Sequence, residues 1–349
     1  MRSVPHPAGT THAIRALHRS AESPEITIAI PAFNRPALLA ETLASIAAQT
    51  LRVPLEVVVC DDGRMSETEA LVRQYASESF RYSSNPFTLG AIGNWNECLR
   101  MARGKWVMVL HEDDTLYPWY LESVMPHLNT RSAAVCTMTS RGPVVPMVRR
   151  PHASPSVVRY QPRYFLKSSM TPFPGVLIRR DLALRLGGFD EAWGPLADYE
   201  FWYRLACTGP IDVVRVIGAF YRVAPGQWTE RIWGRMLGLA HLLRLKIARE
   251  QFPEYPRASR WVARFFTYRN ACCYAERFRA RPETLRRCLT LGAIPMGGLP
   301  NGWVWQALKV ASRSVQRRSH LDSGARRMAP VREVACDIPV GVNGLPRSS

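Results

Sequence analysis

The sequence predicts an α/β fold in which a mixed, mainly parallel sheet is flanked by helices, with a helical region after it. Two observations predict the sheet. Short apolar runs alternate with longer helical stretches between residues 26 and 110, which is typical of parallel strands covered on both faces. Polar residues follow each apolar run, as expected where such a sheet binds a ligand at the carboxyl ends of its strands. Beyond residue 227, the pattern becomes helical and rich in arginine.

Three strands and three helices are predicted before residue 111. The strands are the apolar runs ITIAI, LEVVV and WVMVL, which span residues 26–30, 55–59 and 106–110. The helices are expected over residues 37–49, 67–77 and 92–102. Asn34 and Pro36 suit the cap and first turn of the first helix.

The segment from Ser123 to Arg180 contains no acidic residue, and its prolines favour loops over regular elements. Residues 174–206 then predict a strand, a helix ending at the Gly187-Gly188 pair, a loop, and a helix that begins near Asp198.

The predicted organisation has four parts. They are a loose polar leader over residues 1–24, an α/β domain over 25–226, a helical region over 227–319 and a flexible tail over 320–349. Within the helical region, amphipathic helices are expected over 231–250 and 257–281.

Charge and cysteine usage indicate the kind of partner and the compartment. Forty-six Lys and Arg against 28 Asp and Glu give a formal net charge of +18, which favours phosphates, anionic lipid headgroups or nucleic acid. The eight cysteines form no C-x-x-C pair, so a reducing compartment is expected. We recognise neither a signal peptide nor an apolar stretch long enough to span a membrane. These features predict a cytoplasmic protein that at most touches a membrane surface.

The third apolar run continues through His111 into three consecutive carboxylates. We call His111, Glu112, Asp113 and Asp114 the acid turn. Adjacent carboxylates repel one another and resist leaving water, so a cation or hydrogen-bond donors must offset their charge. At the carboxyl edge of a sheet they suit Mg²⁺ or Mn²⁺ together with substrate phosphates. A solvated loop is the alternative, and His111 is either a metal ligand or a hydrogen-bonding spacer.

A second acidic pair, Asp61 and Asp62, follows the strand predicted over residues 55–59. Asp-Asp-Gly is also ordinary turn chemistry, with Gly63 free to adopt a positive φ. Two acidic strand ends in one parallel sheet nevertheless form a site for a metal and for hydroxyl or imide groups. The pattern therefore favours a nucleoside-diphosphate ligand.

Asp198 has two compatible interpretations. As an N-cap it would accept backbone N–H bonds, and as a general base it would take a proton from a reacting hydroxyl. A helix start also favours the ionised carboxylate that a base requires. Trp193 and Trp228 lie in predicted loops and are candidates for stacking on a sugar or base.

Four segments together resemble the inverting family-2 glycosyltransferases, which have the GT-A fold. They are ITIAIPAFNRPALLAETLASIAAQ, LEVVVCDDG, LGAIGNWNECLRMARGKWVMVLHEDDTLYP and GVLIRRDLALRLGGFDEAWGPLADYEFWYRLACTG, in this order within residues 26–209. No Q-x-x-R-W follows them, which favours transfer of one sugar per encounter over processive synthesis.

The resemblance implies residues that contact the nucleotide. Pro31, Ala32 and Asn34 are implied to line the base pocket. Asp61, with Asp62 behind it, is implied to contact the nucleobase or ribose.

The resemblance also implies a metal site in the acid turn. Asp113 stands at the metal-binding position, and Asp114 and Glu112 assist it, Asp114 toward the metal and Glu112 toward the nucleotide sugar. His111 occupies the place where many relatives have an aspartate.

The sugar and acceptor sides are implied by later residues. The amides of Asn94 and Asn96 are implied to hold the sugar or diphosphate. Asp198 is the implied catalytic base, although Ala197 replaces the glutamate that usually precedes it.

The function implied is metal-dependent, inverting transfer of a single sugar from a nucleotide-diphosphate sugar, as in cell-envelope polysaccharide biosynthesis. A nucleotidyltransferase is one alternative, although PAFNRPALL lacks the glycine-rich loop expected of it. A non-catalytic binder of anionic surfaces or nucleic acid is another, suggested by the net charge. We expect no specific nucleic-acid partner. The basic segments predict a phosphate-bearing or lipid-linked acceptor and peripheral membrane contact.

Overall fold

The structure is a computed structural model that describes residues 24–75, 79–150, 155–169, 173–223 and 228–277. The predicted leader up to residue 23, the predicted tail, and the helical region beyond residue 277 lie outside the described residues.

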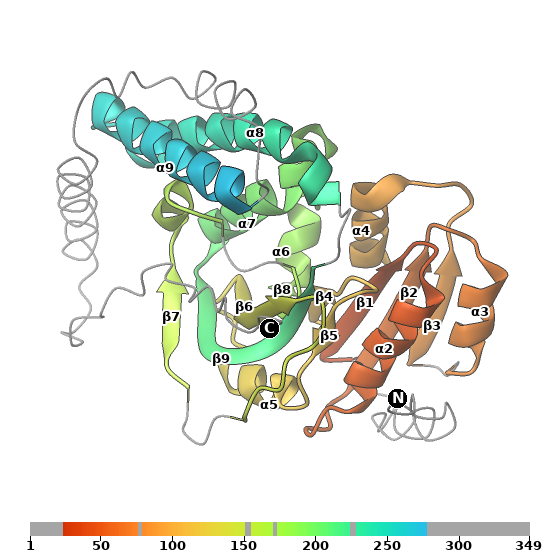
Figure 1. The fold of residues 1–349 in the computed structure, drawn as a ribbon. Helices are drawn as coiled ribbons and strands as arrows, with labels where there is room; N and C mark the ends of the chain where they lie inside the picture. Colours follow the sequence, from red (N-terminus) through yellow and green to blue (C-terminus); the bar gives the residue numbers. More distant parts are fainter. Residues whose placement is uncertain (1–23, 76–78, 151–154, 170–172, 224–227, 278–349) are drawn as a thin grey trace, which may run out of the picture. The chain divides into compact units, whose positions relative to one another are not determined.

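A sheet of nine strands forms the centre of the described chain (Figure 1). Its order is β3-β2-β1-β4-β8-β6-β9-β5, and β7 also pairs with β9. The strands are β1 (Ile26–Ala32), β2 (Leu55–Asp61), β3 (Phe80–Ser84), β4 (Trp106–Val109), β5 (Thr115–Leu116), β6 (Ala134–Gly142), β7 (Val157–Tyr160), β8 (Val176–Arg179) and β9 (Ile211–Arg222).

The sheet is mixed, as the sequence predicts. β1 pairs in parallel with β2 and β4, β2 with β3, and β6 with β9. β8 runs antiparallel to β4 and β6, and β5 and β7 run antiparallel to β9. The predicted α/β class is confirmed.

Helices flank the sheet and complete its two hydrophobic cores. The α-helices are α2 (Pro36–Ala47), α3 (Ser66–Arg73), α4 (Gly90–Met101), α5 (Tyr120–Val124), α6 (Arg180–Arg185), α7 (Ala197–Thr208), α8 (Trp228–Gln251) and α9 (Pro256–Arg277), and the 3-10 helices are η1 (Met125–His127), η2 (Pro162–Leu166) and η3 (Glu191–Leu196).

Alternate residues of a strand enter different cores because successive side chains point to opposite faces. Ile28 and Ile30 of β1 pack with residues of α2 and α5. Ala29 belongs to the other core, which includes residues of α4, α6, α7 and α8. The apolar runs found in the sequence are therefore strands buried on both faces.

The acid-free segment is more regular than the sequence predicts. We expected loops over most of residues 123–180 because of the prolines, and a strand only at the end, where β8 lies. β6 and β7 were not expected. The expectation was wrong because the prolines fall between these strands and not inside them, as at Pro143 and Pro146.

The predicted start of the first helix needs one correction. Arg35, not Asn34, is the N-cap residue of α2, and no side chain caps this helix. Asn34 instead adopts a positive φ of 61°, a conformation that asparagine tolerates better than most residues. Pro36 opens the helix as predicted.

The predicted C-terminal helices are present as α8 and α9, which pack against each other (Figure 1). α8 also contacts η2 and η3, and so the helical region is joined to the sheet domain through these short helices. No helix among the described residues combines the length and apolar character needed to cross a membrane.

The backbone of β1 lies so close to Gly104 that a larger residue there should lower the stability of the fold. A Cβ at this position would lie 2.6 Å from the Thr27 N atom and 2.7 Å from the Ile26 carbonyl carbon. We expect Gly104→Ala to lower the free energy of unfolding by roughly 1–3 kcal/mol because backbone atoms cannot move aside easily. Urea unfolding followed by circular dichroism measures this.

Gly238→Ala is the matched control. Gly238 lies inside α8, and apart from its chain neighbours and the backbone of the same helix no described atom lies within 4 Å of a Cβ placed there. Alanine should stabilise this helix by roughly 0.5–1 kcal/mol. Loss of stability in both variants, or in neither, would contradict the packing described at Gly104.

Candidate active site

The polar ends of three neighbouring strands meet at one edge of the sheet. β1 lies between β2 and β4. At its end Ala32 pairs with Asp61 of β2, and the next backbone amide, Phe33 N, donates a hydrogen bond to Glu112 after β4. The end of β1 thus joins the acidic turn after β2 to the acid turn after β4.

Glu112 is almost fully buried, and hydrogen-bond donors from the β1–α2 connection balance its charge. Its Oε2 accepts from Phe33 N at 2.9 Å and its Oε1 from Arg35 Nε at 2.7 Å. Burial raises the pKa of Glu112, while Arg35 and the Phe33 amide act in the opposite direction. The half-exposed Arg35 also binds Asp113, with Nη1 donating to Oδ2 at 2.6 Å. Arg35 was not among the functional residues predicted from the sequence.

Asp114 is fully buried and has one oxygen without a hydrogen bond. Its Oδ1 accepts from Arg222 N at 3.0 Å, and its Oδ2 has no hydrogen-bond partner among the described residues. Burial, together with the charge of Asp113, raises the pKa of Asp114 well above its usual value. A cation beside Oδ2 would offset that cost.

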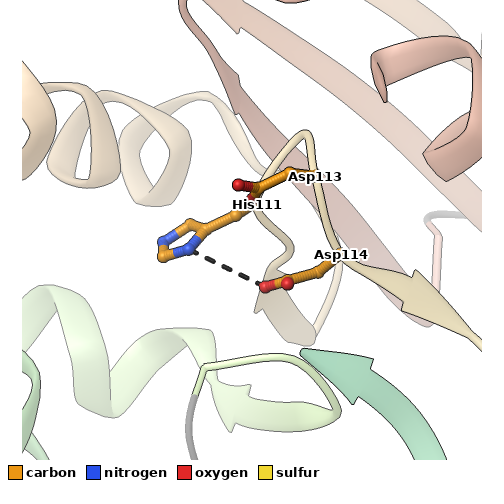
Figure 2. Close-up of side chains that lie close together, drawn as sticks. All are labelled: His111, Asp113 and Asp114. Atoms are coloured by element: carbon orange, nitrogen blue, oxygen red, sulfur yellow. Dashed lines mark ion pairs between the residues drawn. The ribbon is translucent and has the colours of Figure 1, made fainter. Parts of the chain in front are cut away.

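His111 faces the same point. Its Nδ1 lies 3.8 Å from Asp114 Oδ2 (Figure 2), and its buried Nε2 has no hydrogen-bond partner within the described chain. Burial lowers the pKa of His111 to about 4, so the imidazole is neutral at pH 7 and retains a free lone pair.

Together these three side chains form a candidate metal site. One ligand atom each from His111, Asp113 and Asp114 lies within 4.8 Å of the others. Two carboxylates suit Mg²⁺ or Mn²⁺, and a neutral imidazole is also a metal ligand. The unpartnered Asp114 Oδ2 and His111 Nε2 support this fit. From the sequence, His111 was either a metal ligand or a hydrogen-bonding spacer, and the structure places it in the cluster.

Asp61 is buried and shapes the turn after β2. Its Oδ1 accepts from Gly63 N at 2.9 Å and Arg64 N at 3.1 Å, and its Oδ2 accepts from the Tyr82 hydroxyl at 2.9 Å. Burial and the bond to Asp61 raise the pKa of Tyr82 to about 12. Tyr82 therefore remains a hydrogen-bond donor to Asp61 at neutral pH.

Asn34 packs directly against that turn. A Cβ on Gly63 would fall 2.0 Å from Asn34 Oδ1, so only glycine leaves room for the Asn34 side chain in this position. Pro31 is partly exposed and Ala32 fully buried, and the Ala32 carbonyl accepts from Asp62 N at 3.0 Å. The predicted base-pocket residues are thus contiguous with the turn that contains Asp61.

Asp62 binds the start of α4. Its Oδ1 accepts from Leu89 N at 2.7 Å and Asn85 Nδ2 at 2.9 Å, and its Oδ2 from Gly90 N at 2.9 Å. These backbone N–H groups at the helix start have no partner within the helix. Asp62 therefore fixes α4 against the end of β2.

The two asparagines of α4 also bind the protein. The Asn94 amide donates to Cys60 O at 3.0 Å and its carbonyl accepts from Asn85 Nδ2 at 3.1 Å. Asn96 donates to Phe189 O at 2.9 Å and accepts from Phe189 N at 2.8 Å. Both side chains connect elements of the fold, and their predicted contact with the donor stays a prediction.

Asp198 lies in the first turn of α7 but does not cap it. The N-cap residue is Leu196, so the N-cap interpretation of Asp198 was wrong by two positions. Its Oδ1 accepts from Tyr199 N at 2.6 Å. The residue is partly exposed, but burial of its carboxyl group raises the pKa of Asp198 to about 6, against the opposing effect of that hydrogen bond. Ala197 beside it is fully buried.

A row of aromatic rings connects the acid turn to α7. The His111 ring stacks on Trp95 at 5.4 Å and lies 4.7 Å from Phe173. Phe173 lies 5.6 Å from Trp202 of α7 in an edge-to-face arrangement. Trp95 and Phe173 were not predicted as site residues, because nothing in the sequence distinguishes them from other buried aromatics.

Of the two tryptophans proposed to stack on a ligand, Trp193 is half-buried and has a protein partner. Lys246 Nζ lies 5.7 Å from the centroid of its ring. The side chain of Trp228 lies outside the described residues.

The structural role of Asp62 can be tested by measuring the free energy of unfolding. Asp62→Ala removes three hydrogen bonds and leaves the two backbone amides at the start of α4, Leu89 N and Gly90 N, without this acceptor. We expect the free energy of unfolding to fall by roughly 1–3 kcal/mol, as measured by urea titration. Asp190→Ala is the control, because Asp190 accepts a single amide bond at an exposed position and should cost about 1 kcal/mol or less. Equal losses would argue against a special role for Asp62.

Part of the chain is similar to a known protein family and to individual proteins. Residues 27–187 match the family described as Glycosyl transferase family 2. A Campylobacter jejuni protein, GalNAc(5)-diNAcBac-PP-undecaprenol beta-1,3-glucosyltransferase, is 30% identical over 115 residues, which is 32% of this chain and 37% of the relative.

Solved structures show the same fold at low sequence identity. The complex of S. aureus TarS with UDP-GlcNAc has a TM-score of 0.58 at 16% identity, over 76% of this chain and 79% of that chain. The Pyrobaculum calidifontis mannosyltransferase PcManGT, in complex with GDP-Man and Mn²⁺, has a TM-score of 0.51 at 19% identity, over 88% and 89% of the two chains.

Proposed function

Because this chain is a glycosyltransferase of family 2 with the GT-A fold, we propose that it transfers a single sugar from a nucleotide-diphosphate sugar to an acceptor hydroxyl with inversion. The observation that carries the proposal is the presence of two separate carboxylate centres. One is the acid turn at the sheet edge, and the other is Asp198 at the start of α7. Inverting transfer requires one centre for the leaving diphosphate and another for the attacking hydroxyl.

Asp198 is the proposed general base. A pKa of about 6 leaves the carboxylate largely ionised at pH 7 but basic enough to accept a proton, which is the compromise that general-base catalysis favours. In the proposed step Asp198 removes the acceptor proton as the hydroxyl oxygen bonds to the anomeric carbon. The bond from that carbon to the diphosphate oxygen breaks, and its electron pair leaves with the nucleoside diphosphate.

Asp113 and Asp114, together with His111, are the proposed ligands of Mg²⁺ or Mn²⁺. When bound, such an ion would stabilise the negative charge that develops on the departing diphosphate. The unpartnered Asp114 Oδ2 and His111 Nε2 support the assignment, and the P. calidifontis enzyme of the same fold was solved with Mn²⁺. In this structure Arg35 balances the charge of Asp113.

The turn after β2 and the end of β1 form the proposed nucleotide side. Asn34 and Asp61 are placed against the same turn, with Pro31 and Ala32 at its edge. Glu112 borders the end of β1 on the other side. We propose that these residues bind the nucleobase and ribose. Asp62, Asn94 and Asn96 hold the protein elements around them, and we propose that they act on the donor through that positioning.

The proposed acceptor bears phosphate or is lipid-linked, and the proposed location is the cytoplasmic face of a membrane. The C. jejuni relative is named for an undecaprenol-diphosphate acceptor, which supports the first proposal. Cys60, Cys98, Cys136 and Cys207 are free thiols, which supports a reducing compartment. A role in cell-envelope polysaccharide synthesis would fit both.

Asp198→Asn tests the base. We expect the transfer rate to fall about 10²–10⁴-fold while donor binding, measured by calorimetry, is unchanged. Wild-type kcat should rise with pH through about 6 as Asp198 ionises. A variant that keeps wild-type transfer would exclude Asp198 as the base. Glu67→Gln, at an exposed position of α3, serves as the control for purification and folding.

The same variant should be more stable than the wild type. Because burial raises the pKa of Asp198 above its unfolded value, ionisation of this carboxyl opposes folding. The penalty is complete above about pH 6 and disappears below about pH 4, and a shift of about two units corresponds to roughly 3 kcal/mol. Asp198→Asn should therefore unfold at a higher temperature than wild type at pH 8 and at a similar temperature at pH 4. A lower melting temperature at pH 8 would contradict the burial described.

A thermal-shift screen tests donor and metal together. UDP-, GDP- and dTDP-sugars are each added with and without Mn²⁺. One donor should raise the melting temperature only with Mn²⁺, because saturation at 100 times Kd adds about 2.7 kcal/mol of stability. Asp113→Asn should lose that shift and also lose donor hydrolysis and transfer. Asp181→Asn, at an exposed carboxylate of α6, should retain both. A donor shift that is equal without metal would overturn the metal proposal alone.

A further inference from the structure

We propose that residues 143–150, which we call the rim loop, dock the protein onto an anionic lipid surface. The rim loop follows β6 and reads PVVPMVRR. It presents large apolar side chains to solvent: Val144 is 73% exposed, Val145 39% and Met147 99%. Exposed apolar side chains in a group indicate an interaction site, whereas single ones are ordinary.

The rim loop presents these side chains from an anchored backbone. The Tyr117 hydroxyl donates to Pro146 O at 3.1 Å, and Arg222 Nη1 donates to Pro143 O at 3.3 Å. Both prolines also restrict the backbone. Val144 and Met147 thus point outward from a loop whose carbonyl groups are bound to the fold.

Charge favours an anionic partner. The rim loop lies inside the segment from Ser123 to Arg180, which contains no acidic residue. Arg149 and Arg150 directly follow the apolar residues and are exposed, and Arg150 also binds Glu122. Apolar side chains that enter the headgroup region beside arginines that contact anionic headgroups are the combination expected for interfacial membrane binding.

The rim loop also lies next to the candidate active site. The guanidinium of Arg222 that binds Pro143 O also donates from Nε to Asp113 O at 2.9 Å. One side chain therefore connects the rim loop to the acid turn. Docking would hold the proposed metal site close to the lipid surface, where a lipid-linked acceptor presents its phosphates.

Lipid docking by the rim loop extends the lipid-linked acceptor and the membrane location proposed above. Its biological role rests on that proposed function. Its test measures lipid binding alone, without donor or acceptor. Failure of lipid binding would leave the transferase proposal standing, and failure of sugar transfer would leave the binding result standing.

The experiment is vesicle flotation with the full chain. Neutral phosphatidylcholine vesicles are compared with vesicles that also contain phosphatidylglycerol, at low and high salt. The wild type should float with the anionic vesicles, bind neutral ones weakly, and dissociate as salt screens the charges. Val144→Glu combined with Met147→Glu should reduce the partition coefficient at least tenfold. Arg149→Gln should reduce it less.

Leu184→Glu is the matched control, since Leu184 is an exposed leucine on α6 outside the rim loop. It should float as the wild type does. Circular dichroism melts should show that all variants remain folded, because each altered side chain is exposed.

Three results would overturn the proposal. They are a wild type that binds neither vesicle, a wild type that binds both equally at all salt concentrations, and a double variant that floats as the wild type does. Light scattering without lipid provides a further check. If the wild type self-associates and the double variant does not, the rim loop is a contact between copies of this chain and not a membrane surface.

Discussion

The structure around the candidate site depends on balancing negative charge that the chain collects at one edge of the sheet. β2 and β4 both end in carboxylates, and most of these are buried. Each buried carboxylate needs donors or a cation, because the low-dielectric interior disfavours an unpaired charge. Arg35, the amide of Phe33 and the start of α4 supply that balance for Glu112 and Asp62. One oxygen of Asp114 remains without a hydrogen bond among the described residues, and this is where we propose the divalent ion.

The balance of charge also separates the structural carboxylate of Asp62 from that of Asp198, the proposed base. Asp62 has hydrogen bonds to both oxygens and serves as a fixed connection between β2 and α4. Asp198 has a raised pKa and accepts one hydrogen bond from the next residue. A carboxylate that costs stability when ionised is well suited to accept a proton, because protonation relieves that cost. The structural role of Asp62 and the proposed catalytic role of Asp198 therefore call for opposite surroundings.

Rigid packing relates the two halves of the site. The ring of His111 contacts Trp95 and Phe173, and Phe173 reaches Trp202 on the helix that carries Asp198. Asn96 adds hydrogen bonds from α4 to Phe189 in the loop before η3. Because buried aromatic rings and satisfied amides resist displacement, these contacts fix the acid turn and α7 in one framework.

The sequence by itself determined the strands, the helices that alternate with them, and the presence of carboxylates at their ends. Those features depend on neighbouring residues, since apolar periodicity and the place of Asp113 after a buried strand are local properties of the chain. Only the tertiary structure decided what balances those charges. Arg35 meets Asp113 across 78 positions, and Arg222 meets Asp114 across 108. The strands of the proline-containing segment and the raised pKa of Asp198 likewise arise from pairing and burial between distant residues, which local patterns do not encode.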